Sequence, residues 1–196
     1  MKLLLLLLAF SLPPRTKAGE IIGGHEARPH SRPYMACLEI TDGDKILRCG
    51  GCLIREDFVL TALEKKAKRT KAVRPLNLPR RKVYVNPGDV CSVAGWGRLA
   101  PGGELSNTLQ EVELEIQKDQ ECECLLKDNY NKTNQICAGD PKIKRASYRG
   151  DSGGPLVCKK AAAGIVSFGR SNGSAPRVFT RVSSFLSWIK KTMKRS

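Results

Sequence analysis

A six-residue stretch, Gly150-Asp151-Ser152-Gly153-Gly154-Pro155, constrains the fold of this chain more than any other. Its glycines reach backbone angles that other residues avoid, and they let another segment come close. Such a turn can expose the serine hydroxyl and aim neighbouring N–H groups at one point, as a nucleophile with an oxyanion hole requires. A plain tight turn is the alternative interpretation. Two short apolar stretches, 156–158 and 163–169, follow it and predict strands.

Composition narrows the possible partners. The chain has 196 residues, 34 Lys and Arg against 19 Asp and Glu, and a net charge of +15. A surface this basic favours nucleic acid, sulfated glycans or anionic membranes. Neither aromatic–basic interleaving nor zinc-finger spacing points to nucleic acid, so we expect no nucleic-acid partner. No Cys/His cluster completes a zinc site, and we expect neither a metal nor a cofactor.

The first 18 residues predict a secretory signal peptide. A charged start, Met1-Lys2, precedes an apolar core, Leu3–Leu12, that is too short to span a bilayer. We expect no membrane span further on. Eight cysteines agree with an oxidising compartment. Asn131 and Asn172 begin N-glycosylation sequons, which such a compartment could use.

The rest of the chain predicts a mostly β protein. The stretch 109–117 alternates acidic and apolar residues at the period of a half-buried strand. Val73–Pro79 predicts an extended crossing between two halves, and Leu63–Lys71 a basic helix or solvated loop. The other predicted strands are 34–40, 46–54, 58–62, 91–97, 135–139 and 178–182.

Two helices are predicted. One covers 118–126. The other covers 185–194, with Ser183 or Ser184 as its N-cap and Phe185, Ile189 and Met193 along its apolar face.

Five segments of the chain together resemble granzymes, most of all the granzyme B to H group of chymotrypsin-like serine proteases. These segments are 21–33, 48–62, 65–79, 91–97 and 150–155. The resemblance covers nearly all of the chain after residue 20. It implies an all-β fold of two antiparallel β-barrels with the active site between them, and a C-terminal helix. It divides the chain into a propeptide (19–20), a first barrel (21–72), a crossing segment (73–82), and a second barrel with the helix (83–196).

The resemblance also assigns roles in a protease site. Ser152 matches the nucleophile, and the N–H groups of Gly150 and Ser152 match the oxyanion hole. Ser167-Phe168-Gly169 matches the edge strand that pairs with a bound peptide. Ala146 matches the floor of the pocket for the cleaved residue. Arg177 matches a position in that pocket where arginine implies a preference for Asp or Glu, because a guanidinium suits a carboxylate. A surface arginine in a loop is the alternative.

An activation step is implied as well. Removal of Gly19-Glu20 would free the amino group of Ile21, which in this family inserts beside the aspartate before the nucleophile, here Asp151. A buried ammonium needs a paired carboxylate, so the two residues account for each other. A flexible linker is the alternative interpretation of the same stretch.

The resemblance implies two disulfides, Cys91–Cys158 and Cys122–Cys137. It gives no partner to the other four cysteines. Cys49 and Cys52 have the spacing of a redox or metal motif, which we regard as a minor alternative. The four without partners are Cys37, Cys49, Cys52 and Cys124.

One departure from the family decides the functional prediction. Where relatives continue from Thr61-Ala62 into the segment with the triad histidine and aspartate, this chain has Leu63–Lys68 and resumes the family pattern beyond that aspartate. The first barrel is therefore expected to be incomplete. His25, His30 and Asp57 match no catalytic position. Since an unassisted serine is a weak nucleophile, and loss of the base in subtilisin costs about 10⁶ in turnover, we expect an inactive or severely impaired protease.

Two other functions remain open. One is a secreted, non-enzymatic homologue that binds acidic peptides or sulfated proteoglycans, and the other is a hydrolase with an unconventional base. The expected location is the secretory pathway, either the cytolytic granule of lymphocytes or the extracellular space. We also expect a labile first half, with Ile21 unable to dock stably beside Asp151, because a small open sheet is marginal in water.

Overall fold

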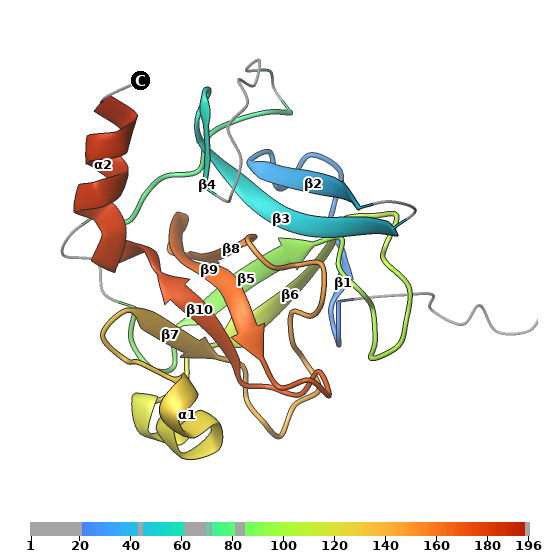
Figure 1. Ribbon diagram of the computed structural model, residues 1–196, viewed down its shortest axis with the longest axis vertical. Helices are drawn as coiled ribbons and strands as arrows, with labels where there is room; N and C mark the ends of the chain where they lie inside the picture. The colour runs from blue at the N-terminus through green and yellow to red at the C-terminus, as the bar shows by residue number, and fades with distance from the viewer. Residues whose placement is uncertain (1–20, 43–44, 61–69, 71, 81–84, 195–196) are drawn as a thin grey trace, which may run out of the picture.

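The computed structural model describes residues 21–42, 45–60, 70, 72–80 and 85–194, and in them ten strands form two sheets (Figure 1). The predicted signal peptide and propeptide lie outside these residues, as does the basic stretch Leu63–Lys71 apart from Thr70. The crossing segment is extended: Asn77 bridges to Ala161 of the larger sheet.

The larger sheet is antiparallel throughout, in the order β1-β6-β5-β8-β9-β10-β7. A bridge joins Ile116, directly after β6, to Ala138 in β7, so the strands from β5 to β10 close into a barrel. This is the predicted second barrel. Its strands are β1 His25–Glu26, β5 Val90–Gly95, β6 Gln110–Glu115, β7 Gln135–Ala138, β8 Pro155–Cys158, β9 Ala161–Gly169 and β10 Arg177–Arg181.

The alternation in β6 places its apolar side chains inside this barrel. Val112 and Leu114 are each 2 % exposed, whereas Glu113 and Glu115 face solvent. Burial of every second residue is what the sequence predicts for a strand with one face exposed to solvent. The barrel core is completed by Val93, Ile136, Leu156, Val166 and Phe179.

The smaller sheet has three strands in the order β2-β3-β4, and lies above the barrel in Figure 1. Within the described residues, no strand pairs with the outer edge of β2 or of β4. The first barrel is thus incomplete, as the sequence predicts. Its strands are β2 Met35–Asp42, β3 Lys45–Arg55 and β4 Phe58–Leu60.

This sheet buries its apolar face against the second half of the molecule. Cys52 packs with Ala162 of β9, and Ile54 and Leu60 pack against the C-terminal helix α2, Leu186–Lys194. The C-terminal end of α2 is held as well, since Arg55 donates a hydrogen bond to the carbonyl oxygen of Met193. The three strands therefore share a core with the barrel and the helix.

Helix α1, Asp119–Leu126, agrees with the prediction and is tied to β7 by the Cys122–Cys137 disulfide. The second predicted disulfide, Cys91–Cys158, joins β5 to β8. Cys49 and Cys52 lie three residues apart on β3. Strand side chains alternate between faces, so these two thiols point to opposite sides and form no common site.

The start of the last helix differs from the prediction. A 3₁₀ turn, Val182–Phe185, precedes α2, and Ser184 in this turn donates its Oγ hydrogen bond to Thr133 O (3.0 Å) instead of capping the helix. Ser183 lies in the same turn. Leu186 takes the buried position that was predicted for Phe185, whereas Ile189 is buried as predicted. Leu186 is buried, and Phe185 is 39 % exposed.

Candidate active site

The turn that carries Ser152 is built around the buried carboxylate of Asp151. The residue is 0 % exposed, and its two oxygens accept hydrogen bonds from the N–H groups of Gly97 and Tyr148, both at 2.8 Å. A Cβ atom at Gly95 or Gly97 would collide with this carboxylate, which explains the Gly-Trp-Gly sequence at the end of β5. Burial raises the pKa of Asp151 to about 6, against the opposing effect of the two N–H groups and of Arg177.

The nucleophile turn itself is anchored on both sides. Gly153 N–H donates to Val166 O (2.9 Å), and Ser152 O accepts from Gly50 N–H of β3 (2.8 Å). Gly150 has φ +101°, a conformation that L side chains rarely adopt. Among the described residues, the N–H groups of Gly150 and Ser152 have no acceptor. Two neighbouring donors without partners are what an oxyanion hole requires.

No described residue is placed to act as a base for Ser152. Its hydroxyl makes no hydrogen bond within the described part of the chain. His25 lies on β1, where its Nε2 is 3.2 Å from the carboxylate of Glu111. His30 is exposed in the N-terminal segment. Asp57 pairs with Arg55, whose Nη2 donates to Oδ2 at 2.8 Å.

Arg177 lies in β10 and is 6 % exposed, which rules out the alternative of a surface arginine in a loop. Its guanidinium lies so close beneath Gly169 that a Cβ atom there would be 2.5 Å from Cζ. Nη1 donates to Arg170 O (3.0 Å), and Cζ lies 5.8 Å from the centre of the Tyr148 ring. Burial lowers the pKa of Arg177, and the charge of Asp151 opposes this change. The group remains cationic, since arginine titrates far above neutral pH.

Two buried polar atoms in this region have no partner among the described residues. They are Nε of Arg177 and Oγ of Ser147. Ser147 follows Ala146, the predicted pocket floor, and both residues are 0 % exposed. Buried donors and acceptors are nearly always paired in folded proteins, so such exceptions point to a ligand or ordered water. Sequence reasoning missed Ser147, which carries no motif of its own.

The N-terminal segment is docked beside this pocket. Ile21 is 0 % exposed and belongs to the barrel core, and Ala146 N–H donates to Ile22 O (3.0 Å). The Ile21 side chain is thus buried in the core of the second barrel. That the amino group freed at Ile21 cannot dock stably beside Asp151 remains a prediction.

The predicted peptide-binding strand has one open side. β9 pairs with β8 from Ala161 to Ile165 and with β10 from Gly164 to Gly169. Val166 is bound to Gly153 and Gly154, so the open side starts at Ser167, which is exposed. Within the described residues, nothing pairs with that side of Ser167-Phe168-Gly169.

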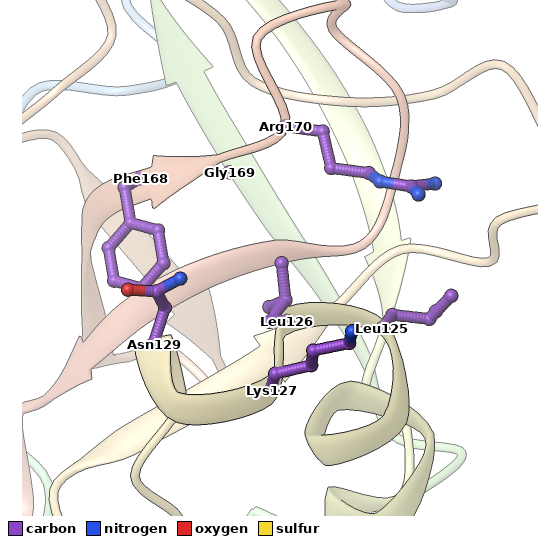
Figure 2. Close-up of a pocket in the computed structure, with 7 residues that line it drawn as sticks. All are labelled: Leu125, Leu126, Lys127, Asn129, Phe168, Gly169 and Arg170. Carbon is purple, nitrogen blue, oxygen red and sulfur yellow. The ribbon is translucent and has the colours of Figure 1, made fainter.

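A cavity of about 620 Å³ lies beside this strand, between the end of α1 and the end of β9. Figure 2 shows the Phe168 ring next to the Asn129 side chain, with Arg170 on the loop after β9. The cavity offers an apolar surface together with basic groups. Its lining consists of Leu125, Leu126, Lys127, Asn129, Phe168, Gly169 and Arg170.

The two sequons lie on exposed turns. Asn131 Oδ1 accepts from Thr133 N–H (2.9 Å), and Asn172 Oδ1 accepts from Ser174 N–H (3.0 Å). Both asparagines are accessible to modification. In the described residues, no cluster of His, Cys, Asp and Glu suits a metal ion, and no helix is long and apolar enough to cross a membrane.

Comparison with known proteins identifies the class. The family model described as "Trypsin" matches residues 21–64 and 62–189, and this chain belongs to that family of chymotrypsin-like serine proteases. Within it the chain is granzyme-like. It is 60 % identical to "Granzyme B(G,H)" of Mus musculus and 51 % identical to "Granzyme B" of Homo sapiens, with all of both chains covered in each case.

Solved structures agree with this assignment. "Structure of GrC" superposes with a TM-score of 0.83 at 50 % identity and covers 89 % of this chain and all of its own. "Human heparin binding protein" superposes with a TM-score of 0.77 at 27 % identity, over 90 % of this chain and 98 % of its own. The expected location in the secretory pathway and the cytolytic granule fits the granzyme relatives.

Proposed function

We propose that this chain is a granzyme-like protease homologue that keeps an acid-selecting peptide cleft and has lost turnover. The observation that carries the proposal is the Ser152 hydroxyl, which lies in a fully formed nucleophile turn but has no hydrogen-bond partner among the described residues. A serine is activated by an adjacent base that takes its proton. Without one, the oxyanion donors and the pocket can bind a peptide but accelerate its cleavage only weakly.

The comparisons support an internal deletion as the cause. The family model matches in two segments that meet at residues 62–64, where this chain departs from the granzyme pattern. The alignment with the mouse relative covers both chains completely over 247 residues, whereas this chain has 196. The open three-stranded sheet fits the same explanation, because a deletion after β4 would remove the strands that close the first barrel.

The buried guanidinium supports an acidic residue at the cleavage position. Nε of Arg177 and Oγ of Ser147 are buried and have no hydrogen-bond partner among the described residues, and Ser147 directly follows Ala146. A carboxylate is the group that complements a buried arginine, and the pair would be a charge-assisted hydrogen bond in a site shielded from water. A lysine or arginine in the same pocket would place two cations together and is therefore excluded.

Turnover is the direct test. Purified Ile21-starting protein should not cleave Asp-containing peptides measurably above Ser152→Ala, and should not react with a serine-directed fluorophosphonate probe. Loss of the base alone corresponds to about 10⁶ in turnover. Cleavage that disappears in Ser152→Ala would overturn the proposal and favour a hydrolase with an unconventional base.

The specificity is tested separately. In a chain with the granzyme segment restored after Ala62, Arg177→Glu should abolish the preference for Asp and leave the Ser152 turn reactive toward the probe. A restored Arg177→Glu enzyme that still cleaved best after Asp would show that the pocket assignment is wrong.

A second function is favoured by the same open strand. A homologue without turnover can still pair a peptide with Ser167–Gly169 and hold its acidic side chain at Arg177. Sulfated glycans are a further candidate, given the charge of +15 and the similarity to human heparin binding protein at 27 % identity. Binding to an immobilised Asp-containing peptide that is lost in Arg177→Gln would support a peptide partner. Retention on heparin that is unaffected by Arg177→Gln would support a sulfated glycan.

A further inference from the structure

The turn that follows β9 contains the second sequon and also holds the guanidinium of Arg177. The carbonyl oxygen of Arg170 accepts hydrogen bonds from Nη1 of Arg177 (3.0 Å) and from Gly173 N–H (3.1 Å). Asn172 and Gly173 are the first two residues of the sequon. The same carbonyl group thus connects the sequon turn to the cation of the pocket proposed for an acidic residue, and Arg170 itself lines the cavity in Figure 2.

The inner side of this turn is packed, so the position of Asn172 is fixed. Gly173 has φ +78°, and a Cβ atom there would overlap Cδ1 of Ile22 at 2.8 Å. Tyr148 donates its hydroxyl hydrogen bond to Ser171 O (2.6 Å). Asn172 lies between these two anchored residues and is exposed. The turn therefore presents the Asn172 side chain to solvent beside the pocket.

The hydrogen bonds of the Asn172 side chain leave its nitrogen available. Oδ1 accepts from the N–H (3.0 Å) and from the hydroxyl (2.8 Å) of Ser174. Nδ2 donates no hydrogen bond within the described part of the chain. A glycan attached to Nδ2 consequently keeps both contacts of Oδ1 and extends into solvent, where a bulky polar group of this kind has to lie.

We propose that Asn172 carries an N-linked glycan that stands at the rim of the Arg177 pocket and limits which acidic partners can enter it. The modification forms a bond between Nδ2 and the anomeric carbon of an oligosaccharide, and breaks the bond from that carbon to the diphosphate of a polyprenyl carrier. The carrier leaves as the diphosphate, and one amide proton is released. The limit on partners rests on the proposed peptide cleft, whereas occupancy of the sequon depends only on entry of the chain into the secretory pathway.

The antiparallel sheet indicates which end of a bound peptide would meet the glycan. β9 pairs antiparallel with β8 as far as Ile165 and with β10, so we expect a peptide added at Ser167–Gly169 to run antiparallel to β9 as well. Its N-terminal end would then lie at Gly169, next to the sequon turn, and its C-terminal end near the Ser152 turn. An extended N-terminal end can pass a glycan, whereas a folded domain attached directly to that end would collide with it.

Occupancy of the sequon is measured first, on the full chain secreted from mammalian cells. The mass of the wild type is compared with those of Asn172→Gln and Ser174→Ala, which destroy the sequon, and of Ser174→Thr, which preserves it. The first two variants should lose the mass of one glycan, and Ser174→Thr should retain it. Masses that differ only by the substitutions would show that Asn172 is not modified and would overturn the proposal.

Binding of three probes by calorimetry then measures the effect of the glycan on the cleft. The probes are an Asp-containing peptide, the same peptide fused directly at its N-terminal end to a small folded domain, and the same peptide fused at its C-terminal end. All forms of the chain should bind the free peptide with similar affinity. The glycosylated wild type should bind the N-terminal fusion roughly tenfold more weakly than Asn172→Gln and Ser174→Ala do, whereas the C-terminal fusion should show no such difference.

Two controls separate the glycan from the substitutions. Trimming the wild-type glycan to its first sugar with an endoglycosidase should restore binding of the N-terminal fusion without any change of sequence. Asn131→Gln removes the other sequon, whose first residue donates its N–H to Gln135 Oε1 (2.8 Å). Gln135 pairs with Thr180, toward the end of β10 away from Gly169, so this variant should not restore the binding.

The outcomes distinguish this inference from the proposed function. If the free peptide binds, and the N-terminal fusion binds equally well with and without the glycan, the glycan does not restrict the cleft and the inference is wrong while the proposed function stands. If the free peptide binds to no form of the chain, the peptide cleft is absent, and the proposed function and the limit on its partners fail together.

Discussion

The buried carboxylate of Asp151 makes the stability of the unprocessed chain depend on pH. In a chain that still carries Glu20, the nitrogen of Ile21 is an amide and cannot neutralise Asp151. Burial then raises the pKa of this carboxyl from 3.8 to about 6, despite hydrogen bonds from Gly97 and Tyr148. The folded state therefore holds a proton between about pH 4 and pH 6 that the unfolded state has released.

The sign follows from proton linkage. Stability falls as pH rises wherever the folded state binds more protons than the unfolded state. The unprocessed chain should thus be most stable below about pH 4 with respect to this group, and lose stability up to about pH 6. A difference of about two pKa units corresponds to about 3 kcal/mol. If removal of Gly19-Glu20 places the ammonium group of Ile21 beside Asp151, as the family resemblance implies, the pKa of Asp151 should fall and most of this loss should disappear.

Denaturant unfolding between pH 4 and pH 7, followed by tryptophan fluorescence under non-reducing conditions, measures this effect. Three proteins are compared: the Gly19-starting chain, its Asp151→Asn variant and the Ile21-starting chain. Only the first should lose about 3 kcal/mol over this range relative to Asp151→Asn, because every other titrating group is common to both. Parallel curves for the Gly19-starting chain and its variant would refute the reasoning. Equal slopes for the Gly19- and Ile21-starting chains would show that the new amino group does not reach Asp151.

Three further outcomes follow from the same structure. Native-state hydrogen exchange should be slower in Gly154–Val182 than in Tyr34–Leu60, and equal protection would show that the open sheet is as stable as the barrel. Replacing Cys91 and Cys158 by alanine should lower the unfolding free energy by about 4 kcal/mol, because the disulfide closes a loop with a sequence separation of 67 and so restricts the unfolded chain. A loss below about 1 kcal/mol in urea unfolding would contradict this estimate. Gly169→Ala should weaken binding of an Asp-containing peptide at least tenfold, because the added Cβ would displace the guanidinium of Arg177. An unchanged affinity, measured by calorimetry, would show that Arg177 does not contact the bound acidic residue.

The elements that could be predicted are those whose local pattern agrees with their tertiary role. In β6 the glutamates alternate with Val112 and Leu114, and the strand has one solvent-exposed and one buried face, so the sequence alone predicts it. β1 could not be found in this way, because two residues, His25 and Glu26, carry no periodicity. They form a strand only because β6 offers them an edge.

The helix boundary shows a different limit. Ser183 and Ser184 are good caps by type, and Phe185 has the right spacing to Ile189 and Met193. Neither property reveals the carbonyl of Thr133, which accepts the Ser184 hydroxyl and favours a 3₁₀ turn at this point. This partner lies 51 residues away in sequence, so the local pattern does not reveal it. The exposed position of Phe185 was not visible in the sequence pattern.

At the candidate site, the motif predicts the turn but not what the turn depends on. The sequence Gly-Asp-Ser-Gly-Gly implies a nucleophile, and the structure adds that the aspartate fits only because Gly95 and Gly97 leave room for its carboxylate. All of these contacts come from the second barrel, which is closed. From the first sheet, Gly50 donates its N–H to Ser152 O. The turn can therefore keep its conformation although, in the described residues, the smaller sheet has open edges.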